Sequence, residues 1–267
     1  MRIFGRITVY GEYLMHGYNQ GLIFPSNLWL DTVQTGETIS HYSLEKDGVY
    51  MFLKKMGIRP NYTIYGNLPL GYGMAGSTAL SLLHLSKIDD IELKKKIVNQ
   101  IDKMIHGFIP SGLDFESCIR QEWGLYCNAY GWQSIRPLAI GYSLIKFPKE
   151  NKLSLDEIQK RILSVKDYLE PIQNRLNNTI KMSGMIDYNS LMKYSKILLE
   201  TEVYSKNVDL FISTLLKQGI IAKGIGGLYD KIILVVHSED DRNYSELNKL
   251  VSYFSGELIS NGIYNKQ

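Results

Sequence analysis

Cysteine is scarce in this sequence of 267 residues, which contains only Cys118 and Cys127. Two thiols are too few for the disulfide framework of a small secreted domain, and their spacing fits no common zinc motif. We therefore expect two reduced, packed side chains in a cytoplasmic protein.

Long apolar runs and strong net charge are lacking as well. No run reaches the roughly 20 apolar residues that a membrane helix needs, and residues 1–6 lack the apolar region of a signal peptide. The formal net charge is only +3, which does not indicate a nucleic-acid surface. The 19 tyrosines are better explained as core and cleft lining than as a base-stacking platform. We expect no membrane and no nucleic-acid partner.

Neither an internal repeat nor a low-complexity tract divides the chain, and a hydrophobic content of 45% is ordinary for a globular protein. Residues 147–152 are polar and rich in turn formers. This segment predicts a boundary between an N-terminal domain, residues 1–147, and a C-terminal domain, residues 148–267.

Hydrophobic periodicity predicts helices and strands in both parts of the chain. Ser154 and Glu157 fit a capping box at the start of one helix. Helices packed on one face of a mainly antiparallel sheet would give an α+β protein. The expected strands are 3–10, 22–33, 61–66, 231–236 and a short terminal strand, and the expected helices are 45–56, 77–87, 90–106, 154–178, 188–204, 205–218 and 243–254.

The glycine-rich segment 69–79, PLGYGMAGSTA, is the most informative part of the chain. Glycines allow backbone amides to approach an anion closely, and a helix starting near residue 77 would present its unpaired N–H groups to that anion. The alternative is a tight turn between a strand and a helix, without a ligand. The phosphate site predicted here comprises Gly71, Gly73, Gly76, Ser77 and Thr78.

Two familiar glycine motifs overlap this segment, and the surrounding sequence disfavours both. For a dinucleotide fingerprint, Pro69 separates the preceding strand from the glycines, and residues 77–105 are predicted helical where a second strand should end in an acid. For a P-loop, Ser77 stands where the motif needs its lysine.

Four segments resemble the motifs of the GHMP kinases and occur in the order typical of that family. Residues 5–17, GRITVYGEYLMHG, resemble the first motif, and residues 69–79 resemble the second. Residues 106–114, HGFIPSGLD, are similar to the mevalonate kinase signature with one extra residue, and residues 222–227, AKGIGG, resemble the third motif. The sequence is identified as a divergent member, closest to the mevalonate kinases.

The resemblance implies a two-lobed α+β fold. Its N-terminal domain would be related to a ribosomal-protein fold and its C-terminal domain would be ferredoxin-like, with ATP and a hydroxyl substrate meeting between them. The implied activity is ATP-dependent phosphorylation of a hydroxyl group on a small metabolite, namely mevalonate or a related hydroxy acid or hydroxyamino acid. The implied cofactors are ATP and Mg²⁺.

The resemblance also implies roles for individual residues. Asp114 matches the catalytic aspartate, acting as general base or orienting anion, and Arg6 stands at the position of a first-motif lysine. Ser77 matches a serine that binds Mg²⁺, and Asp102 falls where mevalonate kinases place a metal-binding glutamate, which suits a hard cation. The expected substrate residues are Glu12, His16 and Ser111.

Simpler explanations stay open for three of these charged residues. Asp102 could be a surface charge, and Asp114 could be an acid at the entry of a helix. Lys223, beside the glycines of the third motif, could contact phosphate or be solvated.

The sequence departs from the family pattern at several points. Arg6 keeps the positive charge of the usual lysine but cannot give up its proton. Residues 74–76, Met-Ala-Gly, replace the usual Leu-Gly-Ser, and Tyr13 replaces the histidine of Gly-Glu-His. Because of these departures, the sequence does not name the phosphoryl acceptor.

Two other functions and one assembly state stay open. The chain could be an inactive GHMP-fold protein that binds nucleotide or metabolite as a sensor or partner subunit, or a decarboxylase acting through transient phosphorylation. Ser77, Asp102 and Asp114 together favour the kinase, because a binder needs no catalytic acid. The assembly state that stays open is a homodimer.

Overall fold

The computed structural model describes residues 1–16, 18–33, 48–58, 63–107, 110–148, 153–225, 231–237 and 244–264. Its internal contacts divide the chain into two compact units, residues 1–6 with 24–121 and residues 7–23 with 122–267. Strands β1 (Ile3–Tyr10) and β2 (Gly21–Val33) pair with each other and contribute residues to both units. The domain boundary expected near residue 147 stays a prediction.

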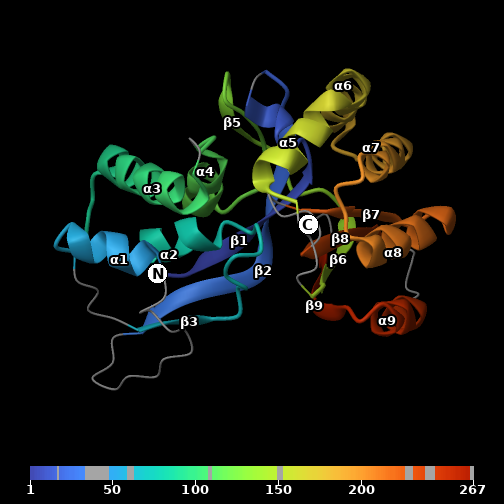
Figure 1. The fold of residues 1–267 in the computed structure, drawn as a ribbon. Helices are drawn as coiled ribbons and strands as arrows, with labels where there is room; N and C mark the ends of the chain where they lie inside the picture. Colours follow the sequence, from blue (N-terminus) through green and yellow to red (C-terminus); the bar gives the residue numbers. More distant parts are fainter. Residues whose placement is uncertain are drawn as a thin grey trace. The chain divides into compact units, whose positions relative to one another are not determined.

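The first unit contains a group of helices that pack against one another. Helix α2 packs against α1, α3 and α4, and these four helices lie together in Figure 1. Nearly all of α2 is buried, so this short helix forms the centre of the unit's core. The elements are α1 (Gly48–Lys55), β3 (Thr63–Gly66), α2 (Gly76–His84), α3 (Ile91–His106) and α4 (Leu113–Arg120).

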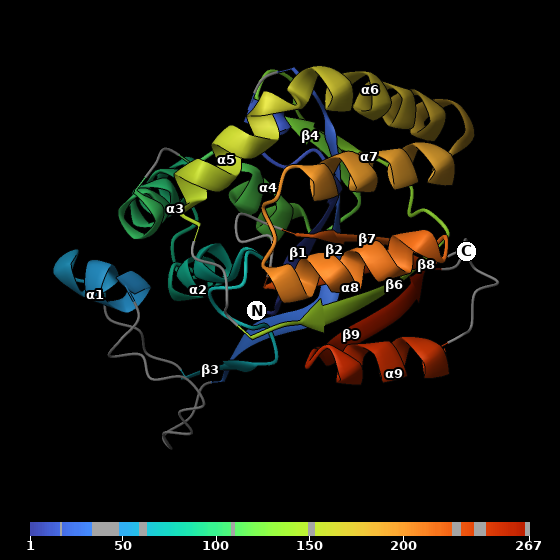
Figure 2. The same cartoon turned by 45° about the vertical axis from the view of Figure 1, so that its right-hand side comes forward.

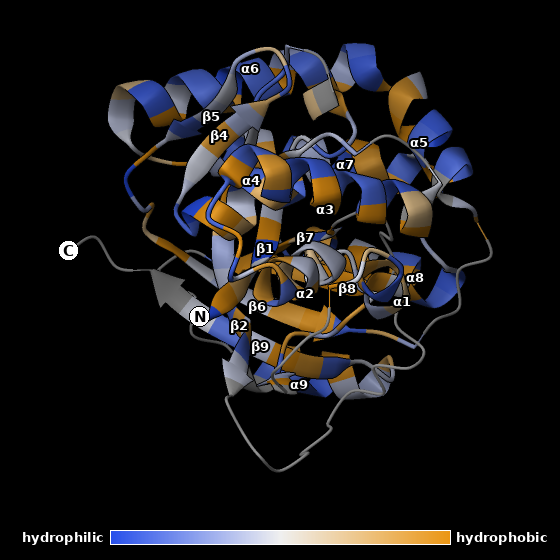
Figure 3. Ribbon diagram, turned by 90° about the vertical axis from the view of Figure 1, so that its left-hand side faces the viewer, coloured by the Kyte–Doolittle hydropathy of each residue, from blue (hydrophilic) through white to orange (hydrophobic). Residues whose placement is uncertain are grey.

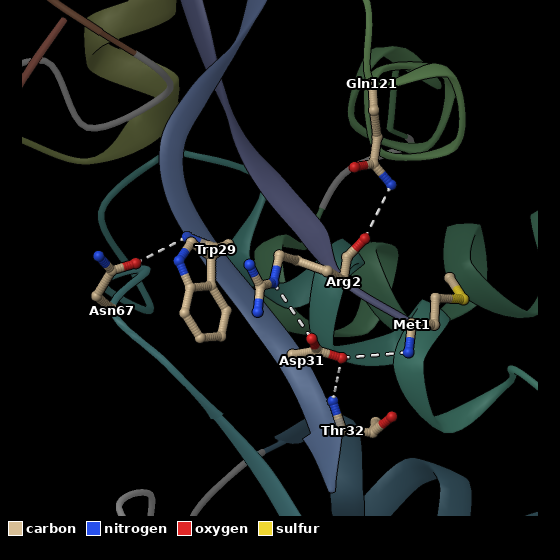
Figure 4. Close-up of polar contacts among 7 residues, drawn as sticks. All are labelled: Met1, Arg2, Trp29, Asp31, Thr32, Asn67 and Gln121. Carbon is tan, nitrogen blue, oxygen red and sulfur yellow. Dashed lines mark hydrogen bonds and ion pairs between the residues drawn. The ribbon is translucent and has the colours of Figure 1, made fainter.

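Strand β3 pairs antiparallel with the end of β2 through a close backbone approach. Gly66 has φ +148°, and a Cβ there would lie 2.1 Å from the carbonyl oxygen of Trp29. Only glycine fits at this point. The Trp29 N–H in turn donates to Asn67 Oδ1 at 2.9 Å (Figure 4).

An ion pair joins the start of β1 to β2. Arg2 Nε donates to Asp31 Oδ2 at 3.2 Å, and its guanidinium lies 4.0 Å from the ring centroid of Trp29 (Figure 4). Partial burial raises the pKa of Asp31, but the Thr32 N–H, the Met1 ammonium and Arg2 together lower that pKa below its usual value. The carboxylate therefore stays charged and holds the two strands together.

The second unit contains an antiparallel sheet of strand order β7-β8-β6-β9. Every residue of β7 and β8 is buried, because α7 and α8 pack against β7 while α9 lies beside β9 (Figure 2). A second pairing joins the start of β2 to β4, which forms a hairpin with β5. The elements are η1 (Leu14–His16), β4 (Gly124–Cys127), β5 (Gly131–Ser134), β6 (Ile140–Lys146), α5 (Leu155–Ser164), α6 (Lys166–Ser183), α7 (Tyr188–Glu200), α8 (Lys206–Lys217), β7 (Ile221–Gly224), β8 (Ile232–His237), α9 (Tyr244–Tyr253) and β9 (Glu257–Tyr264).

The predicted elements agree with the structure except for one helix. The capping box of Ser154 and Glu157 is present, but the helix expected over 154–178 is two helices that meet at Val165. No glycine lies near this residue, and the nearest proline, Pro171, lies inside α6 and does not mark the break. Among the described residues, no helix is both long and apolar enough to cross a membrane.

His84, in the last turn of α2, is a buried histidine without a hydrogen-bond partner among the described residues. Its side chain is 4% exposed. Burial disfavours the charged imidazolium and lowers the pKa of His84 from 6.5 to about 4. The ring is therefore neutral in the folded protein at physiological pH.

We predict an acid-dependent loss of stability from His84. Because its folded-state pKa lies below its unfolded-state pKa, the stabilisation is complete above pH 6.5 and is lost as the pH falls toward 4. Between pH 7.5 and 5 the loss should be about 2 kcal/mol. Urea unfolding at both pH values would measure it, and His84→Leu should remove this component. An equal pH slope in wild type and variant would contradict the prediction.

Candidate active site

The glycine-rich segment forms a loop that leads into α2. Gly71, Gly73 and Ala75 all adopt the left-handed conformation, with φ of 75°, 77° and 61°. Ala75 is the N-cap of α2, and it makes no side-chain cap to the first-turn amides. Helix amides without a side-chain cap at the positive end of the helix dipole are suited to binding an anion.

Ala75 stands where the motif that this segment resembles has glycine. Its left-handed backbone conformation explains why glycine suits this position. The left-handed conformation costs a residue with a Cβ roughly 1–2 kcal/mol of conformational free energy, whereas glycine adopts it freely. Ala75 is therefore a strained residue of this loop. Backbone strain of this kind persists where surrounding contacts fix the conformation.

Asp102 lies on α3 and accepts two hydrogen bonds from the start of α2. Ser77 Oγ donates to Oδ1 at 3.0 Å, and Thr78 Oγ1 donates to Oδ2 at 2.8 Å. Helix α3 is well defined at both ends, since Asp90 caps its first turn and Gly107 ends it with φ 77°. Both hydrophobic and hydrophilic segments appear along α3 in Figure 3. Asp102 is only 4% exposed, so its interpretation as a surface charge is wrong.

The pair of Ser77 and Asp102 fits Mg²⁺ by the chemistry of its donors. One carboxylate and one hydroxyl are hard oxygen ligands, and Mg²⁺ usually takes one or two such protein ligands together with phosphate and water. Within the described part of the chain, no group of three His, Cys, Asp or Glu side chains could hold a metal ion. The remaining ligands would therefore come from nucleotide and water.

We predict that Ser77→Ala weakens the Mg²⁺-dependent part of nucleotide binding by about tenfold, the scale for losing one hydrogen bond or ligand to a charged group. Calorimetric titration of ATP with and without Mg²⁺ would measure it. Ser252→Ala, at an exposed serine of α9, is the matched control. Equal Mg²⁺ dependence in all three proteins would remove Ser77 from the metal site.

Arg6 and Asp114 form an ion pair in the same unit. Arg6 Nε lies 2.9 Å from Asp114 Oδ1, with side-chain exposures of 8% and 33%. Asp114 is in the first turn of α4, whose N-cap is Gly112 with φ 79°, so the carboxylate also lies at the positive end of a helix. Ser111 Oγ accepts from the Leu113 N–H at 3.3 Å at the same helix entry.

The second unit contains a buried ion pair that the sequence analysis missed. Lys223 Nζ contacts Glu12 Oε1 and also donates to the Thr8 carbonyl at 3.2 Å. Both side chains are buried, so the expectation of a solvated Lys223 is wrong. The two residues are 211 positions apart, and no local pattern connects them.

Some predicted residues lie outside what the structure describes. This holds for the side chains of His16 and His106 and for residues 226–230, which include the last two glycines of the third motif. Glu12 is described, and its role in substrate binding stays a prediction.

Comparison with known structures shows the fold of the chain. The chain is similar to Methanococcus jannaschii mevalonate kinase, with a TM-score of 0.71 and 13% identity over 99% of this chain and 98% of that one. It is also similar to Streptococcus pneumoniae phosphomevalonate kinase in complex with phosphomevalonate and AMPPNP, with a TM-score of 0.67 and 14% identity over 99% of each chain. For Lactococcus lactis galactokinase complexed with galactose, the TM-score is 0.58 at 13% identity over 98% of this chain and 94% of that one.

No protein-family model matches the sequence, and no curated protein matches it significantly. The structural matches nevertheless cover almost the whole chain. The chain therefore has the α+β fold of the GHMP kinases, as its motifs predicted, at a sequence identity that marks it as divergent.

Proposed function

We propose that the protein is an ATP-dependent kinase that phosphorylates a hydroxyl group of a small metabolite. The observation that carries the proposal is the contact of Arg6 with both Asp114 and the glycine loop: Nε lies 2.9 Å from Asp114 Oδ1, and Nη2 donates to the Gly73 carbonyl at 3.2 Å. A candidate base, a buried positive charge and a candidate phosphate loop thus lie within one unit. Phosphoryl transfer needs this combination of positioning and charge.

The reaction proceeds by attack of the acceptor hydroxyl on the γ-phosphorus. Asp114 orients the hydroxyl and accepts its proton as the new oxygen–phosphorus bond forms and the bond to the β,γ-bridging oxygen breaks. Arg6 stays protonated and stabilises the negative charge of Asp114 and of the transferred group. Ser77 and Asp102 would hold Mg²⁺, which neutralises charge on the phosphate oxygens.

The substrate belongs to the class of mevalonate and related hydroxy acids or hydroxyamino acids. Support comes from the fold shared with Methanococcus jannaschii mevalonate kinase and with the pneumococcal enzyme, which was solved with phosphomevalonate and the ATP analogue AMPPNP. We assign Glu12, His16 and Ser111 to the substrate side and Gly71, Gly76 and Thr78 to the phosphate loop. We also place the kinase in the cytoplasm, where ATP is available and its two buried thiols stay reduced.

A coupled ADP-release screen tests the proposal. The purified protein would be supplied with ATP, Mg²⁺ and a panel of hydroxy acids, hydroxyamino acids, mevalonate and sugars. Acceptor-dependent ADP release that is lost on removing Mg²⁺ is the expected result. Nucleotide binding without turnover on any acceptor would favour the alternative of an inactive sensor or partner subunit.

A further inference from the structure

Arg6 contacts the glycine loop through its backbone as well as its side chain. The Arg6 N–H donates to the Met74 carbonyl at 3.1 Å, and Nη2 donates to the Gly73 carbonyl at 3.2 Å. Two successive carbonyls of the loop are therefore fixed by one residue of β1. Met74 is itself fully buried.

The direction of these carbonyls determines the direction of the amides that follow them. In a planar trans peptide the C=O of one residue and the N–H of the next point in opposite directions. Because the carbonyls of Gly73 and Met74 point toward Arg6, the N–H groups of Met74 and Ala75 point away from it. These two amides lie in the part of the loop where a phosphate would be bound.

The same contacts immediately precede Ala75, the strained residue of the loop. Gly73 and Ala75, on either side of Met74, are both left-handed, with φ of 77° and 61°. A non-glycine residue keeps such a conformation only when its surroundings impose it. The two hydrogen bonds from Arg6 supply part of that constraint.

A guanidinium is well suited to this double task. Its planar fork offers several N–H donors in fixed directions, so that Nε pairs with Asp114 while Nη2 holds Gly73. A lysine carries all its donors on one strongly hydrated nitrogen and would have to divide that nitrogen between the two acceptors.

We infer that Arg6 is a positioning residue for the phosphate loop, directing the Met74 and Ala75 amides toward the nucleotide, in addition to its role as the ion-pair partner of Asp114. This inference rests on the proposed kinase function. It predicts that changes at Arg6 alter the affinity for ADP, which lacks the transferred phosphoryl group that Arg6 would stabilise.

Arg6→Lys separates the two roles because it keeps the charge and removes the fork. We expect KM for ATP and Kd for ADP with Mg²⁺ to rise by about tenfold, the scale of one hydrogen bond from a charged donor. We expect kcat to fall by a smaller factor than these affinities, because lysine keeps the positive charge beside Asp114. Asp114→Asn leaves the Gly73 contact in place, so its ADP affinity should stay within about twofold of wild type. Steady-state kinetics and calorimetry with ADP would measure these values.

Amide hydrogen exchange gives a readout that does not depend on nucleotide. In the ligand-free Arg6→Lys protein, the amides of residues 71–76 should exchange about tenfold faster, with those of α3 unchanged. If lysine is not tolerated in the fold, Arg6→Gln, which removes the fork and the charge, should show the same faster exchange.

The outcomes separate this inference from the proposed function. Unchanged ADP affinity and unchanged loop exchange in the Arg6 variants would overturn the positioning role, even if the wild type is an active kinase. Failure of the wild type to bind ADP would contradict the kinase, whereas the exchange of the loop amides would still decide whether Arg6 holds the loop.

Discussion

Asp114→Asn is expected to lower kcat by about a hundredfold or more, the usual scale for losing general-base catalysis. The amide has nearly the shape of the carboxylate but cannot accept the proton of an attacking hydroxyl. The structure supports the role because Asp114 Oδ1 is 2.9 Å from Arg6 Nε, and its side chain is one-third exposed and so accessible to a substrate. Nucleotide affinity should persist, since the glycine loop is untouched.

The acceptor found in the ADP-release screen allows the test, with kcat and ATP affinity measured in parallel. Asp156→Asn, at an exposed aspartate of α5, is a matched control that should leave both unchanged. If kcat of Asp114→Asn falls by less than about tenfold, equivalent to about 1.4 kcal/mol of barrier, Asp114 is not the base. Catalysis would then depend on positioning and charge alone.

Residue patterns predicted most of the helices and the strands β1, β2, β3, β8 and β9, but they missed α4 and the strands β4, β5, β6 and β7. The hydrophobic pattern of α3 repeats over several helical turns, and that of β1 extends over several residues of a strand. Patterns of this length are enough to recognise an element. Strands such as β4 and β7, four residues each, show too few alternations. The break at Val165 has no counterpart in the hydrophobic pattern, and the residues around it, Ser164 and Lys166, are exposed.

The candidate site could be predicted only as far as its motifs extend. Asp114 and Ser77 were found because each lies in a contiguous motif, and Asp102 because it lies at a fixed distance from one. The hydrogen bond of Thr78 to Asp102 and that of Arg6 to Gly73 depend on how distant segments fold together. Sequence patterning alone carries no signal for such contacts.

The buried pair of Glu12 and Lys223 is the clearest example of a long-range contact that the sequence hides. Glu12 follows β1, Lys223 is on β7, and both are withdrawn from solvent. After burial itself, the Glu12 charge is the next largest cause that raises the pKa of Tyr194. Because little water surrounds the Glu12 carboxylate, its negative charge affects neighbouring groups strongly. The positive charge of Lys223 compensates that negative charge.

Lys223→Met is therefore expected to destabilise the protein by about 3–5 kcal/mol, because it leaves the Glu12 carboxylate buried without its cation. Methionine fills a similar volume, so packing is largely kept. Replacing both residues, as Glu12→Gln with Lys223→Met, removes the unpaired charge and should recover most of the loss, since an uncharged replacement of a buried pair is often close to neutral.

Urea unfolding of the wild type, both single variants and the double variant forms a double-mutant cycle that isolates the pairwise energy. Lys217→Met, at an exposed lysine of α8, is the control for loss of a lysine and should change stability by less than about 0.5 kcal/mol. If Lys223→Met destabilises no more than the double variant, the cost arises from packing and the Thr8 contact, and the charge of Glu12 is compensated by other groups.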